Sequence, residues 1–198
     1  VFSGKIDLLE DNIPSAFAKF KTASEKGGSG EGANELGLMY YKGYPSENIN
    51  PSYSEAFELF SVSASTGVSC GWCNLGICYE NGHGITRDIS MAIQCYENGT
   101  RGGPETSSVE AMSNLGRLLL HGAICDVSFG TNISDSGNNK KFDNRVFDKA
   151  LYWLRAAADR NDAVASFELG LAYSRGVVGW RGTIVPVDFV CALSHFLH

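Results

Sequence analysis

A Leu-Gly pair recurs four times along the chain, each time inside the same longer pattern. A small residue precedes each leucine by four positions, and a further glycine follows it by seven. The pairs are Leu36-Gly37, Leu75-Gly76, Leu115-Gly116 and Leu169-Gly170, and they are spaced 39, 40 and 54 residues apart. Periods near 40 residues are typical of helical-repeat proteins, in which neighbouring units stack to build one core. The spacing therefore predicts an array of repeats.

Each unit is expected to contain two helices. Apolar residues at three- and four-residue steps predict a first helix, as over residues 33–41 and 70–80. A second helix is marked by an alanine in each unit, at Ala56, Ala92, Ala150 and Ala192. Eleven residues after the alanine stands Gly67, Gly103 or Asn161, and Ala16 with Gly27 repeats the offset upstream. Glycine and asparagine tolerate the left-handed backbone at which helices end, so these positions are predicted to close the second helix.

The glycine inside each first helix is unfavourable locally. Glycine costs about 1 kcal/mol relative to alanine in a helix interior. Its recurrence at one register predicts that the position has no room for a side chain because a partner helix approaches there. These structural glycines are Gly37, Gly76, Gly116 and Gly170.

We expect one repeat domain over residues 1–198. A partial repeat is predicted over 1–29, and repeats follow over about 30–67, 68–104, 105–161 and 162–198, the last one truncated. Residues 1–13 offer no full repeat half. A long polar loop is predicted over about 123–146, either a binding loop or a tolerated insertion. Solenoid ends without a polar cap are expected to expose apolar surface or to self-associate.

Residues 74–88, followed by Ala92, resemble the Sel1-like repeat, a relative of the tetratricopeptide repeat. Residues 111–116, 150–157 and 165–173 resemble parts of the same unit. The resemblance implies an all-α, right-handed superhelical solenoid of antiparallel helix pairs that acts as an adaptor in protein complexes. Known members serve ER-associated degradation beside a membrane ubiquitin ligase, chitin-synthase activation, or bacterial signalling and infection. The repeat alone selects none of these roles.

The cysteines argue against the disulfide-rich, secreted branch of that family. The branch implies cysteine pairs between neighbouring repeats, and none of the equivalent positions here is cysteine. Those positions are Ala64 and Trp72, Thr100 and Met112, and Ala158 and Ser166. Cys78 and Cys95 instead stand where the repeat places buried apolar residues, so both are expected in the core.

Composition excludes several function classes. The net charge of −6 argues against a nucleic-acid partner, since proteins that bind nucleic acids carry basic patches. No apolar run reaches the length that crosses a bilayer. The lone pair Cys70 and Cys73 lacks a second zinc-ligand pair, and the four histidines lack a nucleophile or metal spacing. We therefore expect no catalysis, no metal and no cofactor.

A polar residue stands just before each signature leucine. These residues, with the nearby cation Arg117, form the candidate partner-binding groove: Glu35, Asn74, Asn114, Arg117 and Glu168. If the column lines the concave face, its asparagine amides would bond a peptide backbone. The alternative is ordinary solvated helix surface.

Three functions are compatible with these features. The first is a non-catalytic scaffold for other proteins or peptides. The second is an ER-luminal adaptor in ER-associated degradation, and the third is a secreted, disulfide-braced ligand-binding protein. The compartment stays open between cytoplasm and ER lumen, because the two sequons at Asn98 and Asn132 are no more than chance provides. The chain starts at Val1 and shows no signal peptide, which indicates a piece of a longer protein.

Overall fold

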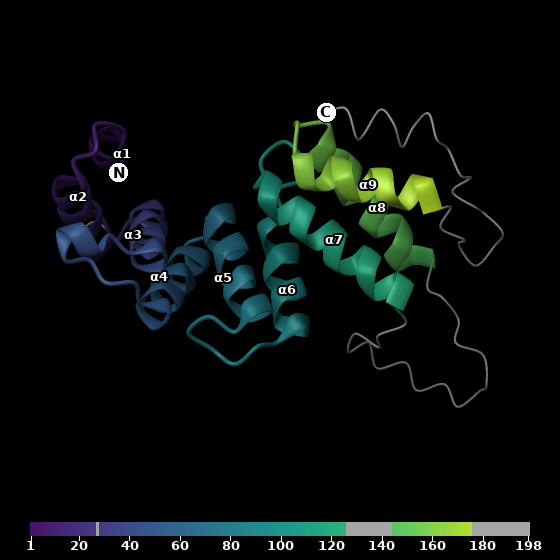
Figure 1. The fold of residues 1–198 in the computed structure, drawn as a ribbon, viewed down its shortest axis with the longest axis horizontal. Helices are drawn as coiled ribbons and strands as arrows, with labels where there is room; N and C mark the ends of the chain where they lie inside the picture. The colour runs from purple at the N-terminus through teal and green to yellow at the C-terminus, as the bar shows by residue number, and fades with distance from the viewer. Residues whose placement is uncertain (27, 126–143, 176–198) are drawn as a thin grey trace. The chain divides into compact units, whose positions relative to one another are not determined.

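The computed structural model describes residues 1–26, 28–125 and 144–175, and their regular elements are helical (Figure 1). A short 3-10 helix, Pro45–Glu47, and an isolated bridge between Tyr44 and Ile49 are the exceptions in this part of the chain. The α-helices are α1 (Phe2–Leu9), α2 (Ile13–Glu25), α3 (Gly30–Lys42), α4 (Tyr53–Ser65), α5 (Ser69–Asn81), α6 (Ile89–Gly99), α7 (Val109–Cys125), α8 (Asn144–Ala158) and α9 (Ala163–Arg175).

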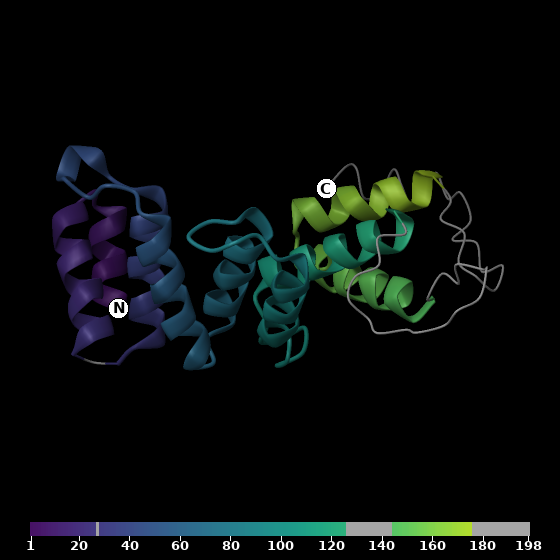
Figure 2. The ribbon, with the colours of Figure 1, turned by 90° about the horizontal axis from the view of Figure 1, so that it is seen from below.

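The chain forms two compact units, Val1–Gly99 and Thr100–His198. In the first unit, α1 packs on α2, and every further pair of consecutive helices up to α5 and α6 packs in the same way. Figure 2 shows the purple and blue helices of this unit standing side by side. In the second unit, α7, α8 and α9 all pack on one another. Consecutive helices that pack in this way form the paired arrangement that the repeat predicts.

The signature glycines lie where a first helix meets its own second helix. A Cβ added to Gly37 would lie 2.7 Å from Cε1 of Phe60, and one added to Gly76 would lie 2.6 Å from Cε1 of Tyr96. A Cβ at Gly116 would lie 2.6 Å from Cγ of Leu154. Close-packed interiors do not admit an extra atom at such distances without movement. Gly170 is buried in α9, and the helix expected to follow it lies outside the described residues.

A second set of small residues faces the preceding unit. A Cβ on Gly32 would lie 2.8 Å from Cβ of Ala23 in α2, and one on Gly71 would lie 2.8 Å from the backbone nitrogen of Ala64 in α4. Each of these first helices therefore has one close approach to its own second helix and another to the second helix before it. Together, the two contacts explain why the small residues keep their register.

Helices α1 and α2 form a further helix pair that the motif does not reveal. A Cβ on Gly4 would lie 2.6 Å from Cε1 of Phe20, the contact that signature glycines make elsewhere. Phe20 follows Ala16 by four residues, as Phe60 follows Ala56. The sequence predicts no full repeat half over residues 1–13, and the structure adds there an eight-residue helix, α1, that makes the contact of a first helix. Ser3 stands where the signature leucine would be, which is why the pattern is not visible there.

The outer surface of α1 is apolar. Phe2 and Leu9 are 80% and 88% exposed, and Ile6 is 40% exposed. The sequence predicts either exposed apolar surface or self-association at an uncapped end. The exposed surface is present, and self-association stays a prediction.

The second helices α4 and α8 end two and three residues before the predicted positions, whereas α6 already ends at Gly99, four residues before Gly103. Gly67, Gly103 and Asn161 have φ angles of 86°, 81° and 63°, all in the left-handed region. Gly27 lies outside the described residues, as does the helix marked by Ala192. After Gly67 and Asn161 the next first helix begins two residues later, whereas α7 begins six residues after Gly103.

The long loop is shorter than predicted. Helix α7 continues through Gly122 to Cys125, and α8 already begins at Asn144. The expected loop over 123–146 is therefore helical at both ends, and its remaining residues lie outside the described part of the chain. A glycine alone does not end a helix, because only the backbone angles that follow it decide whether the helix stops.

The buried cysteines lie in the first unit, as predicted. Cys78 and Cys95 are 0% and 2% exposed and share a core cluster with Phe60 and Leu75. Burial raises the pKa of each thiol to about 12, because the thiolate loses its hydration there. Both residues are free thiols that act as small apolar side chains.

Candidate protein-binding surface

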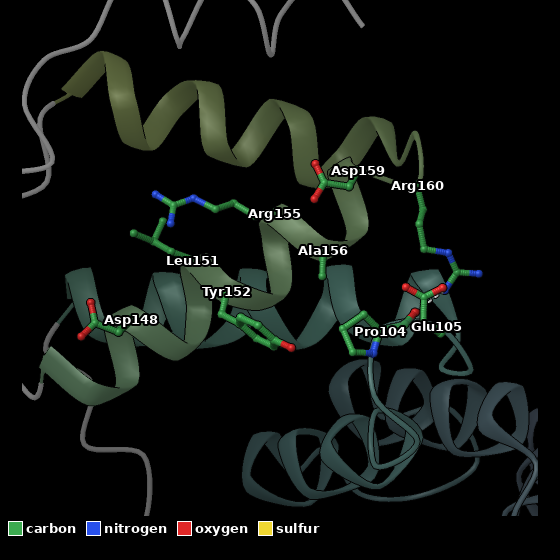
Figure 3. Close-up of a pocket in the computed structure, with 9 residues that line it drawn as sticks. All are labelled: Pro104, Glu105, Asp148, Leu151, Tyr152, Arg155, Ala156, Asp159 and Arg160. Atoms are coloured by element: carbon green, nitrogen blue, oxygen red, sulfur yellow. Dashed lines mark hydrogen bonds between the residues drawn. The ribbon is translucent and has the colours of Figure 1, made fainter.

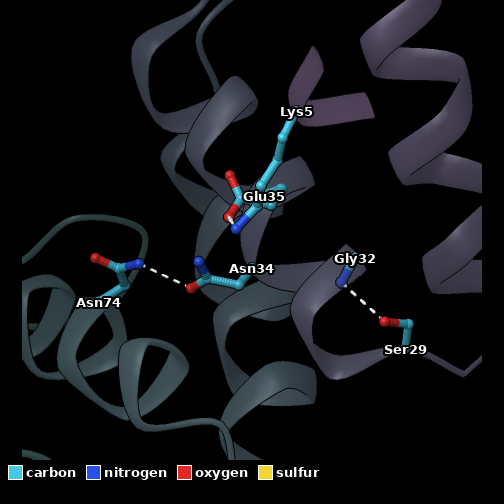
Figure 4. Close-up of polar contacts among 6 residues, drawn as sticks. All are labelled: Lys5, Ser29, Gly32, Asn34, Glu35 and Asn74. Carbon is cyan, nitrogen blue, oxygen red and sulfur yellow. Dashed lines mark hydrogen bonds and ion pairs between the residues drawn. The ribbon is translucent and has the colours of Figure 1, made fainter. Parts of the chain in front are cut away.

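In the first unit, both column residues contact the first helix before them. The Oε1 atom of Glu35 on α3 lies 3.0 Å from Nζ of Lys5 on α1 (Figure 4). The side-chain amide of Asn74 on α5 donates from Nδ2 to Oδ1 of Asn34 on α3, at 2.8 Å. The first contact joins α1 to α3 and the second joins α3 to α5, and both are contacts between side chains.

The amide pair has hydrogen-bonding capacity left over. Asn34 is 5% exposed and Asn74 is half-buried. An amide side chain offers two N–H donors and an acceptor oxygen. Within the described part of the chain, Nδ2 of Asn34 and Oδ1 of Asn74 make no hydrogen bond to protein. The pair therefore presents an unused donor and an unused acceptor next to each other.

The Lys5–Glu35 ion pair is a surface contact. The hydrogen bond to Glu35 raises the pKa of Lys5, against the opposing effect of partial burial. The side chain of Lys5 is 52% exposed, and exposed ion pairs contribute only about 0–1 kcal/mol. A ligand can therefore displace Lys5 from Glu35 at low cost.

In the second unit, the column residues make different contacts. Oε2 of Glu168 on α9 lies 3.0 Å from Nε2 of His121 on α7, and Glu168 is buried. Asn114 accepts a long hydrogen bond of 3.5 Å at Oδ1 from Nη2 of Arg117, one turn further along α7. Glu168 thus links two first helices, whereas Asn114 contacts its own helix.

Asn34 and His121 are the polar residues that the sequence pattern does not single out. Asn34 stands one residue before Glu35, outside the column, and His121 follows Leu115 by six residues. In the structure, each of them contacts a candidate groove residue on a neighbouring first helix: Asn34 bonds Asn74, and His121 lies against Glu168. A search for polar residues at the core-facing edge of the first helices would have found Asn34.

The described ranges contain no group of three or more His, Cys, Asp or Glu side chains that could hold a metal ion. Along α5, Cys70 is exposed whereas Cys73 is buried. None of the helices in the described ranges is long and apolar enough to cross a membrane.

The repeat register can be compared with known families. The sequence model of the Sel1 repeat matches residues 30–67, 73–104, 109–128 and 144–162, more than half of the chain. The chain belongs to the Sel1 repeat family. Its family-model matches begin at α3 and do not include α1 and α2, the pair identified here by the Gly4 contact.

Two curated proteins are similar to part of the sequence. Mouse DAP3-binding cell death enhancer 1 is 31% identical over 152 residues, which cover 68% of this chain and 29% of the mouse protein. The Arabidopsis thaliana ERAD-associated E3 ubiquitin-protein ligase component HRD3B is 37% identical over 59 residues, 30% of this chain and 9% of that protein. The chain spans less than a third of either relative.

Solved structures show the same fold. A Sel1 repeat protein from Oxalobacter formigenes has a TM-score of 0.65 and 23% identity, covering 92% of this chain and 62% of that one. The uropathogenic Escherichia coli antigen c5321, described as an SLR fold, also has a TM-score of 0.65 and 23% identity, over 90% and 32%. The all-α helical-repeat fold expected of the Sel1 repeat chain is confirmed, while its handedness stays a prediction.

Proposed function

We propose that this Sel1 repeat chain is a non-catalytic scaffold that binds an extended segment of a protein partner along its first helices. In the first unit the segment would run across α1, α3 and α5, past Glu35 and Asn74. In the second unit, taken by itself, such a segment would cross α7 and α9, past Asn114, Arg117 and Glu168. Membership of a repeat family used for protein interaction supports the general role.

The Asn34–Asn74 amide pair is the observation that supports this surface most directly. A peptide bond presents one N–H and one C=O, and the pair presents an acceptor on Asn74 and a donor on Asn34. Asn34 is already ordered by burial and by its bond to Asn74, so binding would cost little additional side-chain entropy. Backbone recognition of this kind favours an extended peptide over a folded helix, whose own backbone groups are already paired.

Selection from a displayed library of random 12-residue peptides tests the proposal. Peptides that bind the full chain should lose about ten-fold in affinity to an Asn34→Ala/Asn74→Ala variant, because two hydrogen bonds are removed. Asn81→Ala is the matched control, since Asn81 is an exposed amide on α5 that bonds its own helix at the carbonyl of Ile77. Peptides that bind the double variant as tightly as the parent would exclude this surface.

A second candidate is an adaptor in ER-associated degradation. The similarity to HRD3B over 59 residues favours it. If the candidate is right, deletion of the gene should lengthen the half-life of a misfolded glycoprotein in a pulse-chase experiment. An unchanged half-life would remove this role and leave the general scaffold.

The secreted, disulfide-braced alternative is less well supported. Cys78 and Cys95 are buried free thiols within one core cluster. Mass spectrometry after alkylation of the unfolded protein counts the thiols, and six modified cysteines would eliminate the alternative.

A further inference from the structure

An open groove lies along α8 in the second unit, and it is separate from the candidate partner-binding groove on the first helices. Its volume is about 610 Å³. Helix α8 supplies one of its faces at three- and four-residue steps, and the turn before α7 closes one end (Figure 3). The lining residues are Pro104, Glu105, Asp148, Leu151, Tyr152, Arg155, Ala156, Asp159 and Arg160. None of them belongs to the first-helix column.

An exposed aromatic ring lies in the middle of the groove. Tyr152 is 53% exposed, and its ring rests edge-on against Trp153 with 4.9 Å between centroids. Figure 3 shows Tyr152 between Asp148 and Pro104. The contact with Trp153 holds the ring in place while leaving much of its surface open. An ordered, exposed aromatic face of this kind is a binding element for cations.

Each of the two arginines of the groove donates two hydrogen bonds within the protein. Arg155 donates from Nε and Nη2 to the hydroxyl of Tyr173, at 3.2 and 2.7 Å. Arg160 donates from Nη1 to the backbone carbonyls of Pro104 and Ser107, at 2.8 and 2.9 Å. Figure 3 shows the Arg155 side chain extending away from the Tyr152 ring. Both guanidinium groups are therefore committed to structural hydrogen bonds.

The three carboxylates of the groove have no such partners. Within the described residues, the side chains of Glu105, Asp148 and Asp159 make neither an ion pair nor a hydrogen bond. Ionised carboxylates only accept hydrogen bonds. The groove therefore holds three accepting carboxylates against two hydrogen-bonded guanidinium groups, and the carboxylates lie at both ends of the exposed ring.

We propose that this groove binds a lysine or arginine side chain of a protein partner. The cationic head group stacks on Tyr152 and bonds the carboxylates of Asp148, Glu105 or Asp159. The aliphatic stem packs on Leu151 and Ala156. Such a contact combines a cation–π interaction with charge-assisted hydrogen bonds. The inference concerns a separate surface and does not depend on peptide binding at the first-helix column.

Fluorescence anisotropy with a labelled Gly-Ser-Arg-Gly-Arg-Ser peptide tests it on the full 198-residue chain. A peptide with citrulline in place of both arginines keeps the shape but removes the charge. We expect the citrulline peptide to bind at least about ten-fold more weakly, and Tyr152→Leu to weaken binding of the arginine peptide about five-fold. The double variant Glu105→Gln/Asp159→Asn should have an effect of the same size.

Controls separate the groove from non-specific charge. Glu58→Gln changes an exposed acid on α4 of the first unit and should leave binding unchanged. Circular dichroism melts of each variant confirm that the fold is kept. Equal binding of the arginine and citrulline peptides, or equal losses in Glu58→Gln and in Glu105→Gln/Asp159→Asn, would overturn the proposal. Preferential binding of a Glu-containing peptide would also overturn it, as would a Tyr152→Leu variant that turns a dimer into a monomer in sedimentation, since a second copy would then be the occupant.

Discussion

Tyr96 occupies the space into which a side chain at Gly76 would project. The ring is fixed in that position, because the hydroxyl of Tyr96 donates a hydrogen bond of 2.8 Å to Oε2 of Glu80. Gly76 therefore faces a ring on α6 that is anchored back to α5, the helix to which Gly76 itself belongs. The pair joins the two helices of one repeat at their closest approach.

Gly76→Val should lower the free energy of unfolding by about 3 kcal/mol, through overpacking against Tyr96. Gly76→Ala should cost less, since the gain of about 1 kcal/mol in helix propensity offsets part of the clash. Urea unfolding followed by circular dichroism measures both. Glu58→Val, on the exposed side of α4, reports the effect of a β-branched residue without a clash. A melting temperature for Gly76→Val within a degree of the parent would show that the contact is not tight.

Asn161→Ala should destabilise the second unit. Asn161 has a φ of 63°, where an alanine costs about 1 kcal/mol because it keeps the Cβ that approaches the following carbonyl but lacks the short polar side chain with which asparagine tolerates this conformation. Asn161→Gly should be close to neutral or slightly stabilising, since glycine adopts a positive φ without a steric penalty. Thermal melts of the two variants compare them directly. If alanine and glycine had the same effect, the left-handed turn after α8 would not be a constraint.

Asp7 makes the stability of the first unit depend on pH. Its Oδ2 atom lies 2.7 Å from Nζ of Lys19, and hydrogen bonds from Lys19 and Ser15 lower its pKa below the ordinary value of 3.8. A carboxyl group whose pKa is lowered by folding stabilises the fold above that ordinary value, and the effect is lost as pH falls through the folded-state pKa.

Asp7→Asn should therefore lower the melting temperature at pH 7, and its difference from the parent should shrink below about pH 3.8. Scanning calorimetry between pH 7 and pH 3 follows the difference. Glu10→Gln, an exposed acid at the end of α1, provides the control and should show no such trend. A difference that stays constant over this range would contradict the assignment.

Cys78 and Cys95 should resist alkylation in the folded protein. Both are buried, and a pKa of about 12 leaves almost no reactive thiolate at pH 8. Their modification by iodoacetamide should rise steeply at the urea midpoint, as measured by mass spectrometry of peptides. A cysteine introduced at exposed Ser65 gives the rate for an accessible thiol. Modification of Cys78 at that rate in native buffer would show that α5 opens readily.

The contacts that depend on small size could be predicted from the sequence. Gly37 and Gly76 break the helix-propensity rule at one register, and close approach of a partner helix is the physical reason for such a break. The left-handed ends at Gly67 and Asn161 are predictable for a similar reason, because few residues accept that conformation. Each of these features depends on the residue's own backbone and volume.

The polar contacts between helices could not be predicted in the same way. The bond between Asn34 and Asn74 depends on how α3 and α5 pack, and no local pattern fixes that geometry. The groove along α8 depends on Arg155 reaching Tyr173 and on Arg160 reaching the turn at Pro104. Arg155 and Arg160 have long, flexible side chains with several accessible rotamers. Their hydrogen-bond partners are fixed only once the helices have packed.

The Gly4–Phe20 contact has a practical consequence for anyone who shortens this protein. The family pattern begins at residue 30, which invites a boundary there. Yet Phe20 shares a core cluster with Leu36 and Met39, both of which belong to α3. A fragment that begins at residue 30 would lack Phe20, so the side chains of Leu36 and Met39 would become exposed. Such a fragment should aggregate and express poorly. A minimal fragment that expresses well therefore has to retain the chain from Phe2 onward.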